Sequence, residues 1–278
     1  MKNRTFFPYF GGKALLAKDL IPLFPEHHCY VEVFGGAGNV LLQKHPSKVE
    51  IYNDINTDVV NLFRQVRDNR DAFVEKVKLY PASRSEFHEH IATLADTDLD
   101  PLDRAVLWYI VAQQSFSGHW GSSWTVGSRR NHAAIFKQKV EDLPLITDRL
   151  RGVKIEHKDY QFIIDTYDKD DTLFYLDPPY LPETRSAGEY KHEMSRDDHE
   201  YLLFLLRSIK GKFVLSGYPN ELYDAEGWHT KEFETVCWAA GKTRAIGLQG
   251  EGKVLANQKR TEKIWCNFPL SEQPTLFS

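Results

Sequence analysis

Cys29-Tyr-Val-Glu-Val-Phe-Gly-Gly-Ala-Gly38 sets the fold, because a short apolar stretch runs here directly into a cluster of glycines. The next residues, Asn39-Val-Leu-Leu-Gln43, suit a helix, and Val49-Glu-Ile-Tyr52 is a second stretch of strand length. Aromatic and β-branched residues favour strands, while glycines punctuate the turn between a strand and a helix. The sequence therefore predicts a β-α-β unit at the start of an α/β domain.

The glycine turn is typical of a site for an adenosine-containing cofactor. Small residues let the backbone approach such a ligand, and an acid after the second strand can accept hydrogen bonds from both ribose hydroxyls. Asp54 is the candidate acid. A dinucleotide fingerprint would need a third glycine where this chain has Leu41, which weakens an NAD interpretation. S-adenosylmethionine has no pyrophosphate and tolerates a less stringent turn. A turn without any ligand is the alternative.

The stretch Leu173-Phe-Tyr-Leu-Asp-Pro-Pro-Tyr180 is the most informative about chemistry. Two prolines after Asp177 fix φ and donate no hydrogen bond, so the carbonyl groups around them are rigid and free to accept. The Asp177 carboxylate and the Pro178 carbonyl can each accept one N–H of an exocyclic amine, and Tyr180 offers a flat ring on which a base can stack. Such a loop would aim the nitrogen lone pair for in-line methyl transfer onto a flipped base. The alternative is a proline turn with an incidental tyrosine.

The cysteines argue against a different methylation chemistry. Methylation at carbon 5 of cytosine needs a cysteine nucleophile, usually presented after a proline, and the chain has no Pro-Cys dipeptide. The three cysteines, Cys29, Cys237 and Cys266, are odd in number and far apart, which suits neither a disulfide framework nor a zinc site. We therefore expect methylation of an amino group and no metal.

The remaining pattern divides the chain into three segments. Residues 1–57 form the half that carries the glycine turn. Residues 58–151 contain helical stretches at 61–68, 85–95 and 103–114, and we interpret them as an inserted helical domain. Residues 152–278 return to strands at 153–156, 172–176 and 212–216, with an antiparallel edge pair near 231–236 and 263–268. A helix between the second and third of these strands begins at the N-cap Ser195 and is expected to stop at Gly211.

With these motifs in hand, the chain resembles the Dam-like class of DNA adenine-specific methyltransferases over nearly its whole length. This is an alpha class of amino methyltransferases, and a phage or prophage type is one possibility. Four markers occur in the order of that class: Pro8-Tyr-Phe-Gly-Gly-Lys13, Val31 to Gly38, Asn53-Asp54 and Asp177-Pro-Pro-Tyr180. A weaker match, Arg260 to Phe268, resembles its closing strand.

The resemblance implies a Rossmann-like sheet that binds S-adenosylmethionine and releases S-adenosylhomocysteine, with a DNA-recognition domain inserted between the two halves. It implies catalytic roles for Asp177, Pro178, Pro179 and Tyr180. It also implies cofactor contacts by a larger set: Tyr9, Lys13, Glu32, Phe34, Gly36, Gly38, Asp54, Asp159 and Asp177. The expected reaction is methylation of the N6 amino group of adenine at specific sites in double-stranded DNA, as in restriction-modification systems. An amino methyltransferase acting on RNA or a protein amide is the alternative.

A polar segment at 117–132 is the candidate DNA contact. A glycine-punctuated hairpin there would carry His119, Trp120, Trp124, Arg129 and Arg130 to the duplex, where arginine can reach a guanine edge or a phosphate. Tryptophans folded onto the insert are the alternative. The class commonly has Asn-Arg-x-x-Phe-Asn-Gly where this chain has Gln113-Gln-Ser-Phe-Ser-Gly118, so base contacts do not carry over.

The bulk composition excludes a membrane protein and an overall basic one. Among 278 residues with a formal charge of −4, no apolar run approaches the ~20 residues of a membrane span. Any DNA-binding surface must then be a local patch. The N-terminus has no export signal, so we expect a cytoplasmic protein. The tail Glu272-Gln-Pro-Thr-Leu-Phe277 faintly resembles peptides that dock on bacterial sliding clamps, with a frayed tail as the alternative.

Overall fold

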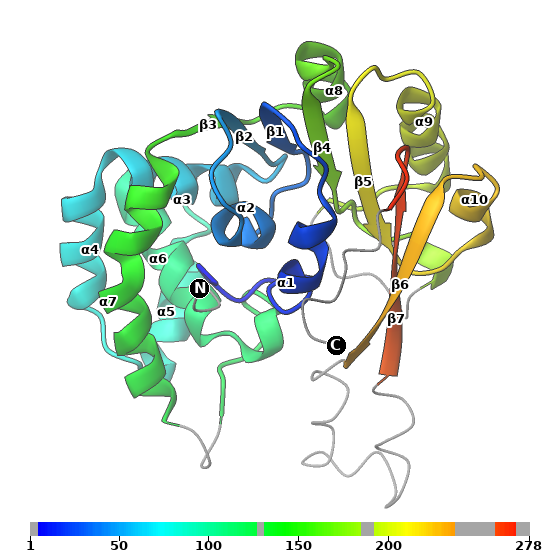
Figure 1. Cartoon of the computed structure of the whole chain (residues 1–278). Helices are drawn as coiled ribbons and strands as arrows, with labels where there is room; N and C mark the ends of the chain where they lie inside the picture. Colours follow the sequence, from blue (N-terminus) through cyan, green and yellow to red (C-terminus); the bar gives the residue numbers. More distant parts are fainter. Residues whose placement is uncertain (1–4, 127–130, 185–191, 237–258, 271–278) are drawn as a thin grey trace, which may run out of the picture.

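Seven strands form one sheet in a computed structural model that describes residues 5–126, 131–184, 192–236 and 259–270. The order across the sheet is β3-β2-β1-β4-β5-β7-β6 (Figure 1). The first five run parallel, and β7 is antiparallel to both of its neighbours. The bounds are β1 Cys29–Glu32, β2 Val49–Asn53, β3 Val153–Glu156, β4 Thr172–Leu176, β5 Lys212–Gly217, β6 His229–Val236 and β7 Lys259–Cys266. The expected Rossmann-like sheet and its antiparallel edge pair are confirmed.

Each face of the sheet is covered by its own layer of helices. Successive strand residues point to opposite faces, so Tyr30 and Tyr52 enter the buried cluster that includes α1 (Ala17–Leu20) and α2 (Asn39–Gln43). Val31 and Ile51 enter the cluster on the other face. That cluster includes α8 (Tyr160–Tyr167), α9 (Arg196–Leu206) and α10 (Glu221–Asp224). The architecture is therefore three layers with the sheet in the middle.

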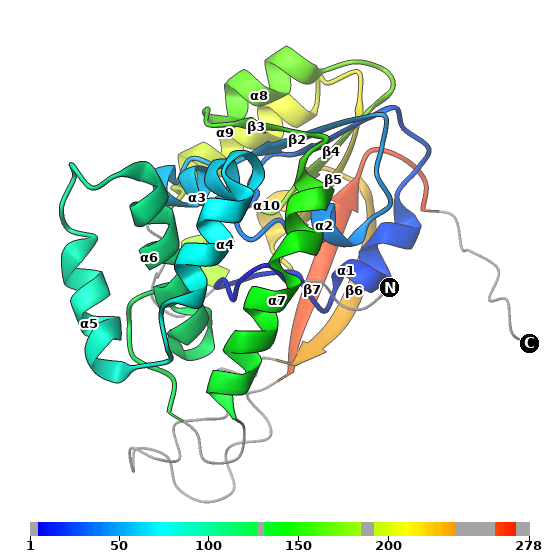
Figure 2. The same cartoon turned by 90° about the vertical axis from the view of Figure 1, so that its left-hand side faces the viewer.

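Five helices lie between β2 and β3 in the chain and gather beside the sheet (Figure 2). They are α3 Thr57–Asp68, α4 Arg70–Lys78, α5 Arg84–Thr93, α6 Pro101–Gln114 and α7 His132–Leu150. The sequence predicted α3, α5 and α6 but not α4 or α7. These helices share one buried cluster with α1, α2 and the sheet. The segment predicted as an insert is thus packed directly on the cofactor half.

Side-chain caps define where several helices begin. Asn56, Ser83 and Asp100 accept hydrogen bonds from backbone N–H groups at the starts of α3, α5 and α6. The predicted N-cap at Ser195 is confirmed as a capping box with Asp198. The expected stop at Gly211 is wrong, because α9 ends at Leu206. None of the described helices is both long and apolar enough to span a membrane.

The strand order reverses direction between β1 and β4. From β1 the chain continues outward to β2 and β3 on one side, and β4 and β5 extend the sheet on the other. Ligands of open α/β sheets bind at such a reversal, beyond the carboxyl ends of the strands. The glycine turn follows β1 and Asp177 follows β4, so the topology brings both predicted motifs to this point.

Candidate active site

A pocket opens beyond the carboxyl ends of β1, β2 and β4. Eight of the predicted site residues line it: Tyr9, Lys13, Glu32, Phe34, Gly36, Asp54, Asp177 and Pro179. Further lining residues were not predicted, among them Phe10, Gly12, Asn39, Asn56, Tyr175 and His192. The N-terminal motif, the glycine turn and the loop after β4 therefore meet at one cavity.

The turn after β1 needs glycine for two separate reasons. A Cβ on Gly35 would lie 2.2 Å from the Tyr52 ring, which is too close for any side chain. Gly36 has a φ of 49°, in the left-handed region that favours glycine. The Tyr52 hydroxyl donates a 2.6 Å hydrogen bond to the Gly36 carbonyl, and its ring stacks on Phe63 of α3. A helix of the middle segment thereby supports the shape of the turn.

Asp54 holds the turn and faces the pocket. One carboxylate oxygen accepts from the Gly36 N–H and the other from the Asn56 N–H, each at 2.7 Å. Burial raises the pKa of Asp54, and these two hydrogen bonds partly offset the effect. A carboxylate oxygen has two lone pairs, so each can accept one more hydrogen bond from a ligand.

Glu32, the last residue of β1, is a buried acid that forms no ion pair with any described residue. It is 2% exposed, and its Oε2 accepts hydrogen bonds from the Tyr30 hydroxyl and the Leu41 N–H. Burial raises the pKa of Glu32 to about 8, despite these two donors. Because Glu32 also lines the pocket, its carboxyl group is protonated near neutral pH at a place that a ligand can reach.

Asn39 brings an unsatisfied amide to the same pocket. The residue starts α2 and is 5% exposed, yet its Oδ1 has no hydrogen-bond partner. Its Nδ2 lies against Gly12, at 2.8 Å from the position that a Cβ would take there. Buried polar groups nearly always find partners in folded proteins. An unpaired amide in a pocket lining is therefore a sign of a ligand contact.

Lys13 and Asp177 form the ion pair at the centre of the site. The Lys13 ammonium lies 2.9 Å from Asp177 and donates to the Gly11 carbonyl at 2.9 Å. The other donor to Asp177 is the Ser216 hydroxyl of β5, at 2.9 Å. Lys13 is 6% exposed and Asp177 is 17% exposed. The carboxylate after β4 is thus fixed by donors from the N-terminal segment and the neighbouring strand.

Tyr180 and Glu262 extend this cluster toward β7. The Tyr180 hydroxyl donates a 2.6 Å hydrogen bond to Glu262, and Lys13 lies 4.8 Å above the centre of the Tyr180 ring. Tyr218, after β5, packs edge-on against Tyr180 at 4.6 Å between ring centres. Tyr180 itself is buried. Glu262 was not predicted as a site residue, because its contact with Tyr180 depends on the position of β7 in the sheet.

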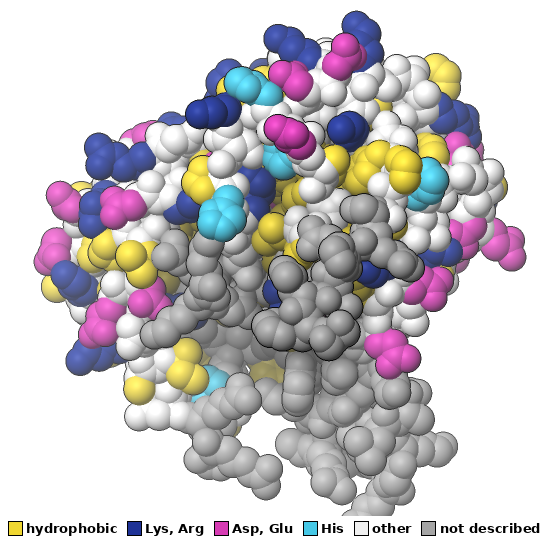
Figure 3. Space-filling model, in the orientation of Figure 1, with side chains coloured by type: hydrophobic (Ala, Val, Ile, Leu, Met, Phe, Trp, Pro, Cys, Tyr) yellow, Lys and Arg dark blue, Asp and Glu magenta, His cyan; other side chains and the backbone are white. Residues whose placement is uncertain are grey.

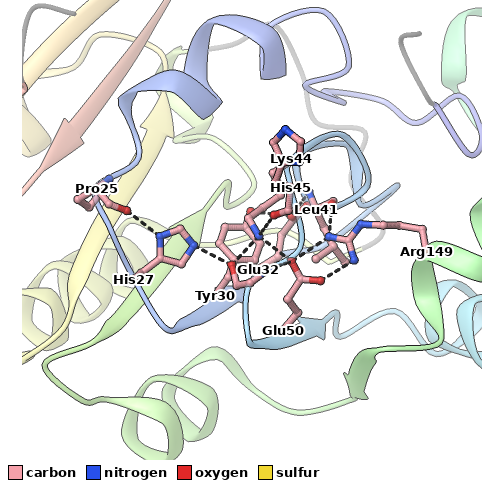
Figure 4. Close-up of polar contacts among 10 residues, drawn as sticks. Pro25, His27, Tyr30, Glu32, Leu41, Lys44, His45, Glu50 and Arg149 are labelled. Atoms are coloured by element: carbon pink, nitrogen blue, oxygen red, sulfur yellow. Dashed lines mark hydrogen bonds and ion pairs between the residues drawn. The ribbon is translucent and has the colours of Figure 1, made fainter. Parts of the chain in front are cut away.

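A second charged cluster lies behind the glycine turn (Figure 4). Glu50 of β2 accepts from Lys44 at 2.6 Å and from both terminal nitrogens of Arg149, the end of α7, at 2.5 and 2.8 Å. Arg149 also donates to the Leu41 carbonyl at 2.8 Å. Burial opposes ionisation of Glu50, but the hydrogen bonds from Arg149 and Lys44 outweigh it and lower its pKa. We call Lys44, Glu50 and Arg149 the buried ion cluster.

The predicted DNA-contact segment starts with a tight turn beside the pocket. Ser115 pairs with Trp124 in an antiparallel bridge, and the His119 ring lies 4.5 Å from the ring of Phe10, a pocket residue. The two indoles turn inward. Trp120 donates to the Trp108 carbonyl at 3.3 Å, and Trp124 donates to the Gln114 amide oxygen at 3.1 Å. The turn therefore borders the cavity, while both tryptophan N–H groups have partners within the protein.

Some predicted site residues lie away from the pocket lining. Gly38, with a φ of 61°, starts α2 and packs against Phe63. The Asp159 carboxylate caps α8 by accepting from the Gln161 N–H at 2.8 Å. Arg129, Arg130 and the tail 272–277 lie outside the described residues. Among the residues that are described, no three His, Cys, Asp or Glu side chains are grouped to bind a metal.

Charge on the visible surface is mixed. On the face seen in Figure 3, Lys and Arg side chains alternate with Asp and Glu across the described residues and do not merge into one large basic area. This agrees with the formal charge of −4. A DNA-binding surface on this face would be local.

Comparison with known proteins gives a consistent result. Residues 9–236 match the family described as D12 class N6 adenine-specific DNA methyltransferase. The chain is 27% identical over 238 residues to the DNA adenine methylase of Haemophilus influenzae, covering 78% of each chain. It is 26% identical to the type II methyltransferase M1.LlaDCHI of Lactococcus lactis subsp. cremoris, covering 95% of each. The DNA adenine methylase of Serratia marcescens is 27% identical, covering 91% of this chain and 96% of that protein.

Proposed function

The chain belongs to the D12 class of N6 adenine-specific DNA methyltransferases, and from this premise we propose which residues hold the cofactor and which hold the adenine. It is a DNA adenine methyltransferase, and its relatives include DNA adenine methylases and type II methyltransferases. No comparison favours RNA or a protein amide as the substrate. S-adenosylmethionine is the general methyl donor of such enzymes.

The pocket suits S-adenosylmethionine in chemistry. It is concave and lined by apolar side chains together with a few polar groups, as small-molecule sites usually are. Asn39 brings an amide whose oxygen lacks a partner, and Glu32 brings a carboxyl group without a cation. The amino-acid end of the cofactor carries both an ammonium donor and a carboxylate acceptor, which match an amide and an acid. These unsatisfied groups support a zwitterionic ligand end beside α2.

We assign the cofactor contacts from this pocket lining. Asp54 would accept the ribose hydroxyls with the lone pairs that the backbone leaves free. Tyr9 and Phe34 would supply apolar walls, and the Gly36 turn would allow close backbone approach. Gly38 would act indirectly, by letting the chain enter α2. Asp159 lies outside the pocket lining and caps α8 with its Oδ1, so it would reach the adenine ring of the cofactor with its remaining oxygen, Oδ2.

Asp177 carries the proposed chemistry. Bound S-adenosylmethionine supplies an electrophilic methyl group on a sulfonium centre. The Asp177 carboxylate would accept one N–H of the target amine and the Pro178 carbonyl the other, which orients the nitrogen lone pair. Lys13 and Ser216 keep the carboxylate in position. A carboxylate that holds this N–H can also take the proton that the nitrogen loses once it is methylated.

Tyr180 would form the wall against which the flipped adenine stacks. Stacking of a base on an aromatic ring is worth ~1–3 kcal/mol, and the base does not need to be paired with another strand. Pro179 lines the pocket and would lie between the base and the cofactor. The ring is buried in the free protein, so its face would be uncovered when the base enters.

The middle segment, 58–151, would recognise double-stranded DNA. The position of this segment supports that role. The turn around His119 borders the pocket through Phe10, so a duplex lying on this turn would bring a flipped base to Asp177. Trp120 is still 36% exposed and offers a ring edge, whereas Trp124 serves mainly to hold the turn. Arg129 and Arg130 would add phosphate or guanine contacts.

The test compares turnover with cofactor binding in Asp177→Ala. Methyl transfer to unmethylated plasmid DNA should fall by ~1,000-fold or more, as expected when a preorganised transition-state contact is removed. Affinity for S-adenosylhomocysteine, measured by calorimetry, should change far less. Asp171→Ala, an exposed acid just before β4, is the matched control and should keep full activity. Wild-type turnover in Asp177→Ala would remove this loop from the mechanism.

A further inference from the structure

Glu262 of β7 is a buried acid in contact with the proposed catalytic loop. Its Oε2 lies 2.6 Å from the Tyr180 hydroxyl and 4.0 Å from the Lys13 ammonium, and its side chain is 13% exposed. Burial raises the pKa of Glu262, and Lys13 and Tyr180 oppose that effect only in part. A carboxylate kept in such a place costs free energy that an apolar residue would not.

The position of Glu262 follows from the strand order. β7 pairs with β5 through Gly217 and Lys263, so residue 262 lies beside the carboxyl end of β5. Tyr218 follows β5 and packs edge-on against Tyr180, while Arg260 of β7 donates to the Tyr218 hydroxyl at 2.6 Å. The closing strand thus contacts one aromatic side chain in the loop after β4, Tyr180, and one after β5, Tyr218.

The Tyr180 ring is consequently fixed from three directions. Tyr218 meets it edge-on with 72° between the ring planes, Lys13 lies above it, and Glu262 holds its hydroxyl. The Tyr180 hydroxyl lies on the axis about which the ring rotates, so the hydrogen bond to Glu262 anchors the far end of the side chain, while the edge-on contact with Tyr218 restricts rotation of the ring. A charge-assisted hydrogen bond of this kind is directional and stronger than a neutral one.

We propose that Glu262 is a positioning residue for methyl transfer, which anchors the hydroxyl end of Tyr180 and so sets the position of the ring on which the adenine stacks. The inference rests on the proposed role of Tyr180. Glu262 does not itself touch the base or the cofactor. Its loss should lower the rate of the bound complex, kcat, and leave the affinity for S-adenosylhomocysteine unchanged.

A double-mutant cycle between positions 180 and 262 tests this. On unmethylated plasmid DNA, Glu262→Ala should lower kcat by ~10- to 100-fold, the value of one hydrogen bond to a charged group. Glu262→Gln, which keeps an acceptor, should recover most of that loss. Tyr180→Phe should lower kcat similarly, and in this background a change at position 262 should have no further effect. Glu232→Ala on β6, an exposed acid, is the matched control and should keep the wild-type kcat.

The outcomes separate the two claims. Additive losses in the double variant, or a full loss in Glu262→Gln, would overturn the positioning role. An unchanged kcat in Glu262→Ala combined with a strong loss in Tyr180→Ala would overturn it too, and would leave the role of Tyr180 intact. An unchanged kcat in Tyr180→Ala would overturn both. Should Glu262→Ala fail to fold in a thermal-unfolding control, Glu262→Met, which is similar in size and cannot accept this hydrogen bond, takes its place in the cycle with the same expected results.

Discussion

Two buried acids on neighbouring strands, Glu50 of β2 and Glu32 of β1, have opposite surroundings. Glu50 is 3% exposed and is held by Lys44 and Arg149, and its pKa is lowered. Glu32 is 2% exposed, contacts no cation, and has a pKa of about 8. They are close together, since Glu50 pairs with Tyr30, the residue two positions before Glu32. Both lie on the same face of the sheet.

The difference separates a structural region from a binding region. The buried ion cluster pairs its charges internally and ties α7 to β2 and α2, so it contributes to the stability of the sheet, although the Arg149 Nε has no hydrogen-bond partner among the described residues. The pocket leaves the Asn39 amide oxygen without a hydrogen-bond partner and Glu32 without an ion-pair partner among those residues, which is costly in the free protein and useful only if a ligand completes them. Buried charges that are paired thus explain the stability of one region, and a buried amide oxygen without a partner points to ligand binding in the other.

The largest change in stability is expected in the buried ion cluster. Arg149→Met removes one partner of a buried pair, so the free energy of unfolding should fall by about 3–5 kcal/mol. Urea denaturation measures it. Arg151→Met, two residues further at an exposed position, is the matched control and should change stability by less than ~0.5 kcal/mol. A loss below ~1 kcal/mol for Arg149→Met would show that the cluster is not structural.

A smaller effect is expected from Glu32, whose titration should make the free energy of unfolding depend on pH. With a folded pKa of about 8 and an ordinary value of 4.5 when unfolded, the folded state retains a proton that the unfolded state has lost. Stability should therefore fall as the pH rises through this window, and it stops falling above the folded pKa. Glu32→Gln lacks this titration, so from pH 6 to pH 8 it should gain about 2 kcal/mol relative to the wild type. Parallel stability curves for the two proteins would refute the raised pKa.

The smallest expected effect is a change in affinity for the cofactor. Asp54→Ala removes acceptors for the ribose, so the Kd for S-adenosylhomocysteine should rise about tenfold, or somewhat more. Calorimetry measures it at constant pH and salt. Asp165→Ala on α8 is an exposed control and should bind normally. Equal affinity in Asp54→Ala and the wild type would take Asp54 out of the site and weaken the distinction between the two regions.

The sequence predicted those parts of the fold that depend on short, local patterns. β3 and β4 have the predicted bounds, and α2 spans 39–43 as expected, because apolar stretches between turn residues define them. α7 was missed, since Pro144 lies inside it and proline normally ends a helix. α4, Arg70–Lys78, was missed because it is short and more than half charged. Tertiary packing on α3, α6 and α7 stabilises such a helix, and no local pattern reports that.

In the candidate site, too, residues within short motifs were predicted and residues that depend on the fold were not. Lys13, Asp54 and Asp177 were predicted because each belongs to a recognisable motif, and they do line one pocket. Asn39 was not, since only the folded structure shows that its amide lacks a partner. Glu262 was not, because β7 reaches Tyr180 only by inserting between β5 and β6. Motifs therefore predicted residues that line the pocket, whereas residues that contact them from behind, such as Glu262, required the fold.

We infer that the methyl donor pairs with the Asn39 amide and the Glu32 acid of the pocket. Calorimetric titration of the purified wild-type protein with S-adenosylmethionine, without DNA, tests this inference. We expect saturable binding of one cofactor per chain, displaced by S-adenosylhomocysteine. The absence of any saturable binding would contradict it, because the acid and the amide beside α2 would then have no ligand to pair with.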